Sequence, residues 1–174
     1  MITRYFIRAD YTITDTNTGA KSSLLSELVR GKNNSELSFA TKTEAREHMA
    51  TLPSIKHNGN YRRDYTYHVE AVEYGFCNMH GWSDVHPFEI IRVVSDKTIE
   101  VREMAADLDQ DFKPEVISGG FVGHCVNQDK QAYKYRSCPD GQVLRVRLGK
   151  KGWKSKMGRH ALSTQPRKFY DYNF

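Results

Sequence analysis

Four arginines and four aromatic residues within residues 75–174 are the side chains best suited to bind a nucleotide. The arginines are Arg102, Arg145, Arg147 and Arg159, and the aromatic residues are Trp82, Phe88, Tyr133 and Trp153. A guanidinium group can donate two parallel hydrogen bonds to phosphate oxygens, and an aromatic face can stack on a base. Taken singly, each residue is better explained as part of a strand surface or of a small core. Taken together, the group favours a site for an anionic nucleotide.

A second basic cluster lies in the segment Lys-Lys-Gly-Trp-Lys-Ser-Lys at residues 150–156. Its four lysines and its tryptophan are Lys150, Lys151, Trp153, Lys154 and Lys156. Such a segment can contact the backbone of RNA or DNA. It could equally be the solvated tip of a hairpin, because no helix-turn-helix, zinc-finger or RNA-recognition motif accompanies it. Nucleic-acid binding through this segment is the alternative to nucleotide binding.

Cysteines and histidines raise the question of a metal site or a catalytic pair. Cys77 and His80 have the spacing of one zinc-ligand pair, but His124 and Cys125 are adjacent and make a poor second pair. A nucleophilic Cys-His pair needs a third group to orient it, and none can be picked out. Walker-type and Rossmann-type glycine spacings are missing as well. We therefore expect no metal, no cofactor and no catalytic residue, although a dispersed site for phosphate esters stays open.

The charges of the chain are unevenly distributed. Residues 130–174 contain 12 Lys and Arg residues against two acidic residues, a balance of +10. Residues 1–129 contain 14 Lys and Arg residues against 19 acidic residues, a balance of −5. An anionic ligand should therefore favour the C-terminal end of the chain.

The composition is that of a folded protein, with 39% hydrophobic and 27% charged residues. Apolar runs are only a few residues long, far short of the roughly 20 residues that cross a bilayer, and no apolar signal core follows Met1. The three cysteines are an odd set, which favours reduced thiols over disulfides. We expect a cytoplasmic protein, in the host cell, that does not contact a membrane.

The first part of the chain combines strand patterns with one helix. Residues 3–14 alternate as a half-buried strand, and residues 24–29 form a short apolar cluster that could be a helical turn or a strand. Thr41 and Glu44 form a capping box that predicts a helix over residues 42–52. After a polar loop, residues 65–74 alternate as a further strand. The resulting order is strand, strand, helix, strand.

From Gly75 onward, short alternating runs separated by turn residues predict β structure. Residues 88–94 and 98–103 form the clearest hairpin, and residues 132–136 and 143–148 predict a second one. The connection over residues 104–131 is long, as functional loops often are. The sequence thus predicts an α+β protein, with an N-terminal ββαβ unit over residues 1–74 and a small antiparallel β-barrel or β-sandwich over residues 75–174. The two parts would be one compact unit or two abutting modules.

A string of spaced motifs runs through the second part. The motifs occupy residues 81–88, 91–94, 97–102, 133–135, 139–141, 152–153, 158–160 and 169–174. This string resembles a small family of hypothetical proteins that is common in phages and other mobile elements, and the resemblance covers about residues 75–174. The pattern is also similar to phage anti-Thoeris proteins, which sequester cyclic ADP-ribose signals. The chain departs from the family at Val85, which replaces a usual arginine, and in the insertion over residues 104–131.

The resemblance implies a β-rich homo-oligomer that binds an anionic cyclic nucleotide as an anti-defence protein and does not cleave it. Arg102, Arg147 and Arg159 would then contact phosphates, and Trp82 or Phe88 would lie against a base. The full set of residues expected at the ligand is Trp82, Asp84, Phe88, Arg102, Tyr133, Arg147 and Arg159. The alternative is a basic nucleic-acid-binding module of phage origin.

Overall fold

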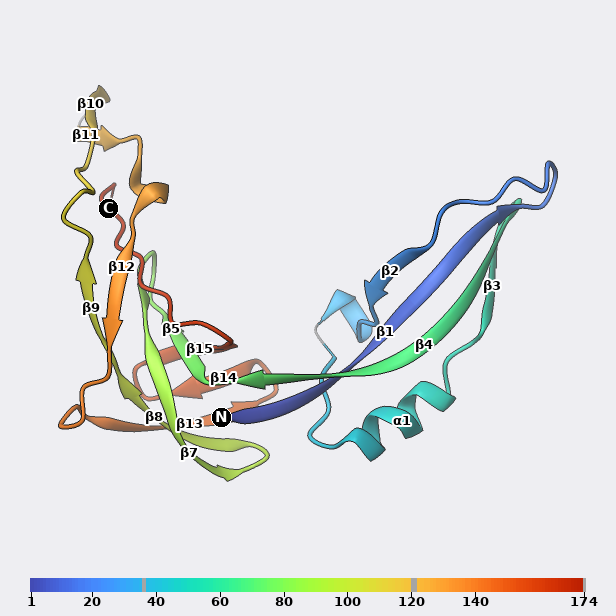
Figure 1. Cartoon of the computed structure of the whole chain (residues 1–174), viewed down its shortest axis with the longest axis horizontal. Coiled ribbons are helices and arrows are strands. Elements are labelled where there is room, and N and C mark those ends of the chain that lie inside the picture. Colours follow the sequence, from blue (N-terminus) through green and yellow to red (C-terminus); the bar gives the residue numbers. More distant parts are fainter. Residues whose placement is uncertain (36, 120–121, 174) are drawn as a thin grey trace. The chain divides into compact units, whose positions relative to one another are not determined.

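A four-stranded sheet organises residues 3–73, which form one compact unit of the computed structural model. The structure describes residues 1–35, 37–119 and 122–173. The sheet order is β2-β1-β4-β3, and β1 pairs antiparallel with β2 as β3 does with β4. The strands are β1 (Ile2–Asp15), β2 (Leu25–Leu28), β3 (Ile55–Asn58) and β4 (Tyr61–Tyr74), and a short 3₁₀ turn, η1, spans Lys32–Asn34. Figure 1 shows β1 and β4 running side by side as long strands.

Helix α1 (Lys42–Ala50) begins at the predicted capping box. The hydroxyl of Thr41 accepts a hydrogen bond from the backbone N–H of Glu44 at 3.2 Å, and the Glu44 carboxylate accepts one from the Thr41 N–H at 3.1 Å. These bonds satisfy N–H groups that have no partner inside the helix. The helix ends at Ala50, two residues before the predicted end.

Strand β3 is the element of this unit that the sequence does not reveal. All four of its residues are exposed, so no alternation of apolar and polar residues marks it as a strand. It forms because the chain reverses at Gly59, whose φ of +57° is easily reached only by glycine, and Asn58 then pairs with Tyr61. Strand β4 consequently begins four residues earlier than predicted.

Residues 1–2 and 74–174 form a second compact unit, which is built on a six-stranded antiparallel β-barrel (Figure 1). Around the barrel the strands pair in the order β5 (Phe76–His80), β7 (Phe88–Ser95), β8 (Thr98–Glu103), β13 (Val143–Gly149), β14 (Gly152–Ser155) and β15 (Gly158–Ser163). Pairing of β15 with β5 closes the barrel, and β6 (Val85–His86) adds to β5. The predicted fold class is confirmed, with a barrel rather than a sandwich.

Alternate side chains of the strands fill the barrel. Ile99 and Val101 on β8 lie opposite Val146 and Leu144 on β13, and all four are buried. Burial of such apolar side chains is the main force that stabilises a small barrel. The remaining core residues are Ile2, Cys77, Met79, Phe88, Ile90 and Trp153. The first two residues of the chain belong to this unit because Ile2 packs in its core.

The predicted hairpin between residues 132–136 and 143–148 is wrong. Strand β12 (Tyr133–Arg136) pairs with β9 (Ala105–Leu108), whereas β13 pairs with β8 and β14. The reason is that Leu144 and Val146 complete the barrel interior beside β8, which a pairing with β12 would not permit. The long insertion therefore extends from the barrel as its own set of elements, which also holds β10 (Val116–Gly119), β11 (Val122–Cys125) and η2 (Gln128–Lys130).

The C-terminal segment ties this insertion to the barrel. The backbone N–H of Lys168 donates to the hydroxyl of Tyr135 at 2.9 Å, and that of Tyr170 donates to the Gln131 side chain at 3.0 Å. These contacts fix the segment to the elements that precede it in the chain.

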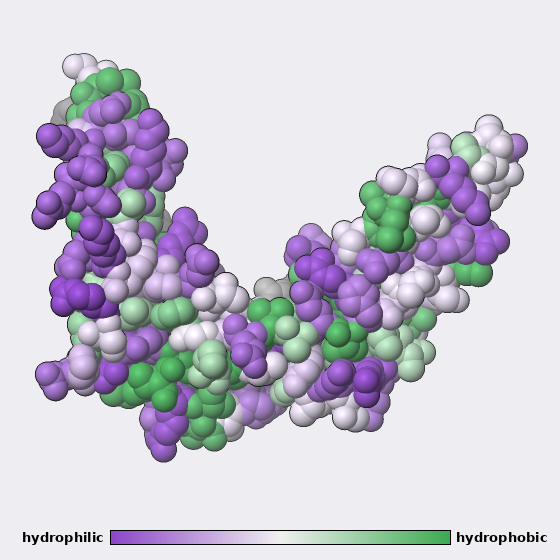
Figure 2. Space-filling model, viewed as in Figure 1, coloured by the Kyte–Doolittle hydropathy of each residue, from purple (hydrophilic) through white to green (hydrophobic). Residues whose placement is uncertain are grey.

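Hydrophobic surface is visible in Figure 2 over the part of the barrel where β7 and β8 lie in Figure 1. On β7, the side chains of Ile91, Val93 and Val94 are between 40% and 45% exposed. Within the described residues, no helix has the length and apolar character needed to span a membrane.

Candidate functional site

The outer face of β13, β14 and β15 carries the basic residues of the C-terminal half. Along β13, Leu144 and Val146 are buried whereas Arg145 and Arg147 are exposed. The same alternation places Lys154 on the outside of β14, because its neighbours Trp153 and Ser155 are buried. Alternation along a strand thus separates an apolar inner face from a cationic outer face.

Three cations form a continuous row across this face. Arg147 lies directly opposite Lys154, and Lys154 lies directly opposite Arg159. Adjacent strands are about 4.8 Å apart, and like charges placed directly opposite each other destabilise a sheet. The row, which we call the cationic row, is therefore a feature that packing alone does not explain.

The two turns that join these strands bring further lysines to the same place. The β13–β14 turn presents Lys150 and Lys151, and it closes at Gly152 with a φ of +94°, which favours glycine. The β14–β15 turn presents Lys156, and the hydroxyl of Ser155 stabilises it by accepting a hydrogen bond from the Met157 N–H at 3.1 Å.

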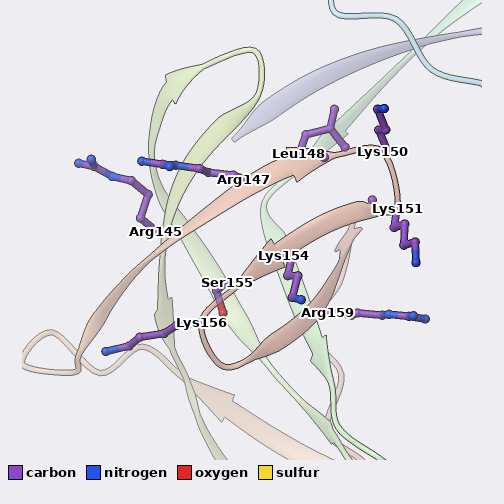
Figure 3. Close-up of a pocket in the computed structure, with 11 residues that line it drawn as sticks. Arg145, Arg147, Leu148, Lys150, Lys151, Lys154, Ser155, Lys156 and Arg159 are labelled. Atoms are coloured by element: carbon purple, nitrogen blue, oxygen red, sulfur yellow. The ribbon is translucent and has the colours of Figure 1, made fainter.

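Together these residues line a groove with a volume of about 700 Å³. Its walls are formed by Arg145, Arg147, Leu148, Gly149, Lys150, Lys151, Gly152, Lys154, Ser155, Lys156 and Arg159. Figure 3 shows the long basic side chains spreading in different directions from the three strands and the two turns. Among the residues that the structure describes, the lining contains seven cationic side chains and no carboxylate.

Ion pairing distinguishes Arg145 from the other cations of the groove. Arg145 donates to Glu100 at 2.8 Å, and Arg92 binds the same carboxylate at 2.8 Å. These two guanidinium groups lower the pKa of Glu100 to about 2. In the part of the chain that the structure describes, the other six cations of the groove have no ion pair within 4 Å. Their charge is therefore available to an anion.

Arg102 does not reach this groove. Its guanidinium binds Glu89 at 2.9 Å and donates to the carbonyl oxygen of Pro139 at 2.6 Å, and only 20% of its side chain is exposed. These contacts hold the segment before β13 against β8. The geometry thus gives Arg102 a structural role, and its predicted phosphate contact stays a prediction.

The aromatic residues expected at the ligand are also separated by the fold. Phe88 is 1% exposed and Trp153 is 7% exposed, because both point into the barrel core. Neither can present a ring face to a base without unfolding the barrel. Trp82, in contrast, is 90% exposed.

Asp84 and Tyr133 take part in the contacts of the C-terminal segment and the insertion. The Asp84 carboxylate accepts a hydrogen bond from the Asp171 N–H at 2.8 Å. The Tyr133 hydroxyl donates to the Gln131 side chain at 2.6 Å, and burial raises the pKa of Tyr133 to about 12. Both residues thus make structural contacts, and their predicted ligand contacts stay predictions.

The cysteines and histidines do not assemble into a cluster. Cys77 lies in the barrel core, where burial raises the pKa of its thiol to about 12, so the thiolate is disfavoured. The Cys125 thiol donates to the Asn127 side chain at 3.4 Å. Over residues 1–35, 37–119 and 122–173, no group of three or more Cys, His, Asp and Glu residues is placed to hold a metal ion.

His160 lies beneath the cationic row, on the inner face of β15. Its Nε2 atom shares a hydrogen bond with the Ser155 hydroxyl at 2.9 Å, and its ring meets that of Phe88 edge-on at 5.5 Å. Burial lowers the pKa of His160 below its ordinary value of 6.5. The folded protein therefore binds fewer protons here than the unfolded chain does once the pH falls below that value.

This difference predicts that acidification below about pH 6.5 destabilises the fold, and that His160→Gln weakens the effect. Glutamine stays neutral and can still bind Ser155. Thermal unfolding at about pH 7.5 and about pH 5 should show a smaller fall in Tm for His160→Gln than for the wild type. His57→Gln, at an exposed position on β3, is the matched control and should behave as the wild type. An equal fall in all three proteins would show that His160 does not contribute.

All seven cations of the groove were candidates from the sequence, but they were divided between two hypotheses. Arg147 and Arg159 were expected to bind a nucleotide, whereas Lys154 belonged to the nucleic-acid alternative, and the structure brings all three into one row. The available signal was the alternation of residues 152–156, in which Trp153 and Ser155 point inward and the lysines point outward.

Comparison of the chain with protein-family models, with curated proteins and with solved structures finds no match.

Proposed function

We propose that the barrel binds nucleic acid by holding its phosphate backbone in the cationic groove. The observation that carries this proposal is the cationic row of Arg147, Lys154 and Arg159, in a groove whose described lining residues include no carboxylate. Three like charges on paired strands reduce stability unless an anion compensates them. Phosphates spaced along a strand of nucleic acid supply that compensation at several points at once.

The spread of the charges favours a polyanion over a single small ligand. Six cations without an ion pair come from three strands and two turns, and Figure 3 shows their side chains diverging. A compact ligand would contact only some of them, whereas a chain of phosphates can follow the whole groove.

A cyclic nucleotide is the second candidate ligand, and the size of the groove is the observation in its favour. A volume of about 700 Å³ lies within the roughly 300–1,000 Å³ of small-molecule sites. Arg147 and Arg159 would then bind its phosphates, in keeping with the anti-defence role that the family resemblance implies. The burial of Phe88 and Trp153 removes two of the expected stacking partners, so we place this candidate second.

Binding without catalysis is part of the proposal. The described residues of the groove are arginine, lysine, glycine, leucine and serine, and none of them is a histidine, cysteine or carboxylate that could act as a base or nucleophile. The homo-oligomer and the cytoplasmic location stay predictions from the sequence.

Competition between the two ligand classes tests the proposal. A fluorescently labelled single-stranded oligonucleotide is bound to the purified protein, and unlabelled oligonucleotide or cyclic ADP-ribose is then added while anisotropy is followed. We expect the unlabelled oligonucleotide to displace the label and the cyclic nucleotide to leave it bound. Tight binding of cyclic ADP-ribose together with no binding of the oligonucleotide would reverse the order of the two candidates.

A further inference from the structure

Trp82 is the most exposed large hydrophobic residue of the described chain, at 90%. A single exposed apolar residue is common on protein surfaces, so exposure alone assigns no role. The position of the residue and the rigidity of its loop are what distinguish Trp82.

The loop that carries Trp82 is fixed at its base. It spans residues 81–84 between β5 and β6, and the Gly81 N–H donates to the carbonyl oxygen of Asp84 at 2.9 Å. The next residue, Val85, exchanges two backbone hydrogen bonds of 3.0 Å with Phe169. Together with the bond from Asp171 to Asp84, these contacts hold the loop while its tip stays open to solvent. Because the loop is already held in place, little conformational entropy of the loop is lost when a ligand binds to this indole.

The strand register places this loop beside the cationic groove. Arg159, the last member of the cationic row, pairs with His80 on β5. Gly158 is also close to the end of β5, because a Cβ atom added to Gly158 would lie 3.7 Å from the His80 carbonyl oxygen. The loop of Trp82 begins directly after His80. The loop of Trp82 therefore neighbours the β14–β15 turn, whose Lys156 lines the groove.

We infer that Trp82 stacks on an unpaired base of a strand whose phosphates lie in the groove, so that the protein prefers single-stranded nucleic acid to duplex. This inference rests on the proposed function. The bases of a duplex are already stacked on their neighbours, whereas a base of a single strand can turn its face to an indole. Stacking does not depend on base identity, so the preference is for strandedness and not for sequence.

The fluorescence of the Trp82 indole can itself report the binding of a base. The chain has two tryptophans, and the other one, Trp153, is buried in the barrel core. Stacking of a base on Trp82 should quench the emission of the exposed indole and leave that of Trp153 unchanged.

The test compares Trp82→Ala and Trp82→Phe with the wild type, using one oligonucleotide as a single strand and annealed to its complement. We expect Trp82→Ala to weaken single-strand binding by about 5- to 150-fold, the range for loss of one stacked base, and duplex binding by less than about 2-fold. Trp82→Phe should retain most of the single-strand affinity, because phenylalanine can still stack. Tyr61→Ala, which removes a 51% exposed aromatic residue from the N-terminal unit, is the matched control and should bind as the wild type.

The outcomes separate the inference from the proposed function. Single-strand binding that Trp82→Ala leaves unchanged, without quenching in the wild type, overturns the inference alone. An equal loss for single strand and duplex overturns the preference for single strands. Failure of the wild type to bind either form overturns the proposed function, and the inference with it.

Discussion

Replacement of Arg147, Lys154 and Arg159 together by glutamine should lower the affinity for a single-stranded oligonucleotide by about two to three orders of magnitude at about 50 mM salt. The three side chains form the cationic row, and each is expected to neutralise one phosphate. Each phosphate contact on a single strand contributes about 0.7 to the slope of log affinity against log salt, which gives the size of the loss. Fluorescence anisotropy titrations measure it.

The matched control changes three exposed cations of the N-terminal unit, Lys21, Lys42 and Arg46, to glutamine. Both triple variants lower the formal net charge from +5 to +2. Affinity of the control should stay within about 3-fold of the wild type, because these three cations do not line the groove and exposed charges outside it are screened by salt. An equal loss in both variants would mean that net charge, and not the groove, attracts the oligonucleotide.

The same variant of the cationic row should be at least as stable as the wild type. Because like charges on paired strands repel, we expect its Tm to rise by about 2–4 °C. If the three cations served only to stabilise the fold, the Tm of the variant would fall instead. Thermal unfolding of the variant used for binding therefore distinguishes a binding surface from a structural one.

Trp153→Ala should lower the free energy of unfolding by about 3–5 kcal/mol, the usual cost of removing a large buried aromatic side chain. Trp153 points into the barrel between Leu148 on β13 and His160 on β15, which are its register partners. Truncation would leave a cavity that closed strand pairing cannot collapse. Urea unfolding followed by far-UV circular dichroism measures the change.

Trp82→Ala is the natural comparison, because it removes the same side chain from a position that is 90% exposed. Its unfolding midpoint should match that of the wild type. A stable Trp153→Ala protein that has lost nucleic-acid binding would contradict the burial argument. It would instead restore the hypothesis that Trp153 contacts the ligand.

Local chemistry made much of the fold predictable. The capping box of Thr41 and Glu44 needs only residues within one helical turn, and it forms as expected. The hairpin of β7 and β8 joins two runs rich in β-branched residues by a short turn at Asp96 and Lys97, so neighbouring residues contain the information it requires.

Pairing between distant strands was not predictable in the same way. The choice of β8 over β12 as the partner of β13 depends on where Leu144 and Val146 find a core, which no single segment reveals. The cationic row has the same origin, since it exists only because the registers of β13, β14 and β15 align one residue from each.

The type of an aromatic residue likewise did not predict whether its side chain is buried or exposed. Phe88 is followed at a spacing of two by Ile90, and this alternation places both inside the barrel. Trp82 lies in a loop where no alternation applies, so its exposure depends on the contacts that fix that loop.

The salt dependence of single-strand binding tests the central claim most directly. A backbone held by the groove must release counterions, so log affinity plotted against log salt should have a slope of about −2 to −4. This corresponds to a loss of about 15- to 250-fold between about 50 and about 200 mM salt. The slope should become shallower by about 2 when Arg147, Lys154 and Arg159 are replaced by glutamine. A slope near zero in the wild type, or an unchanged slope in that variant, would contradict the account.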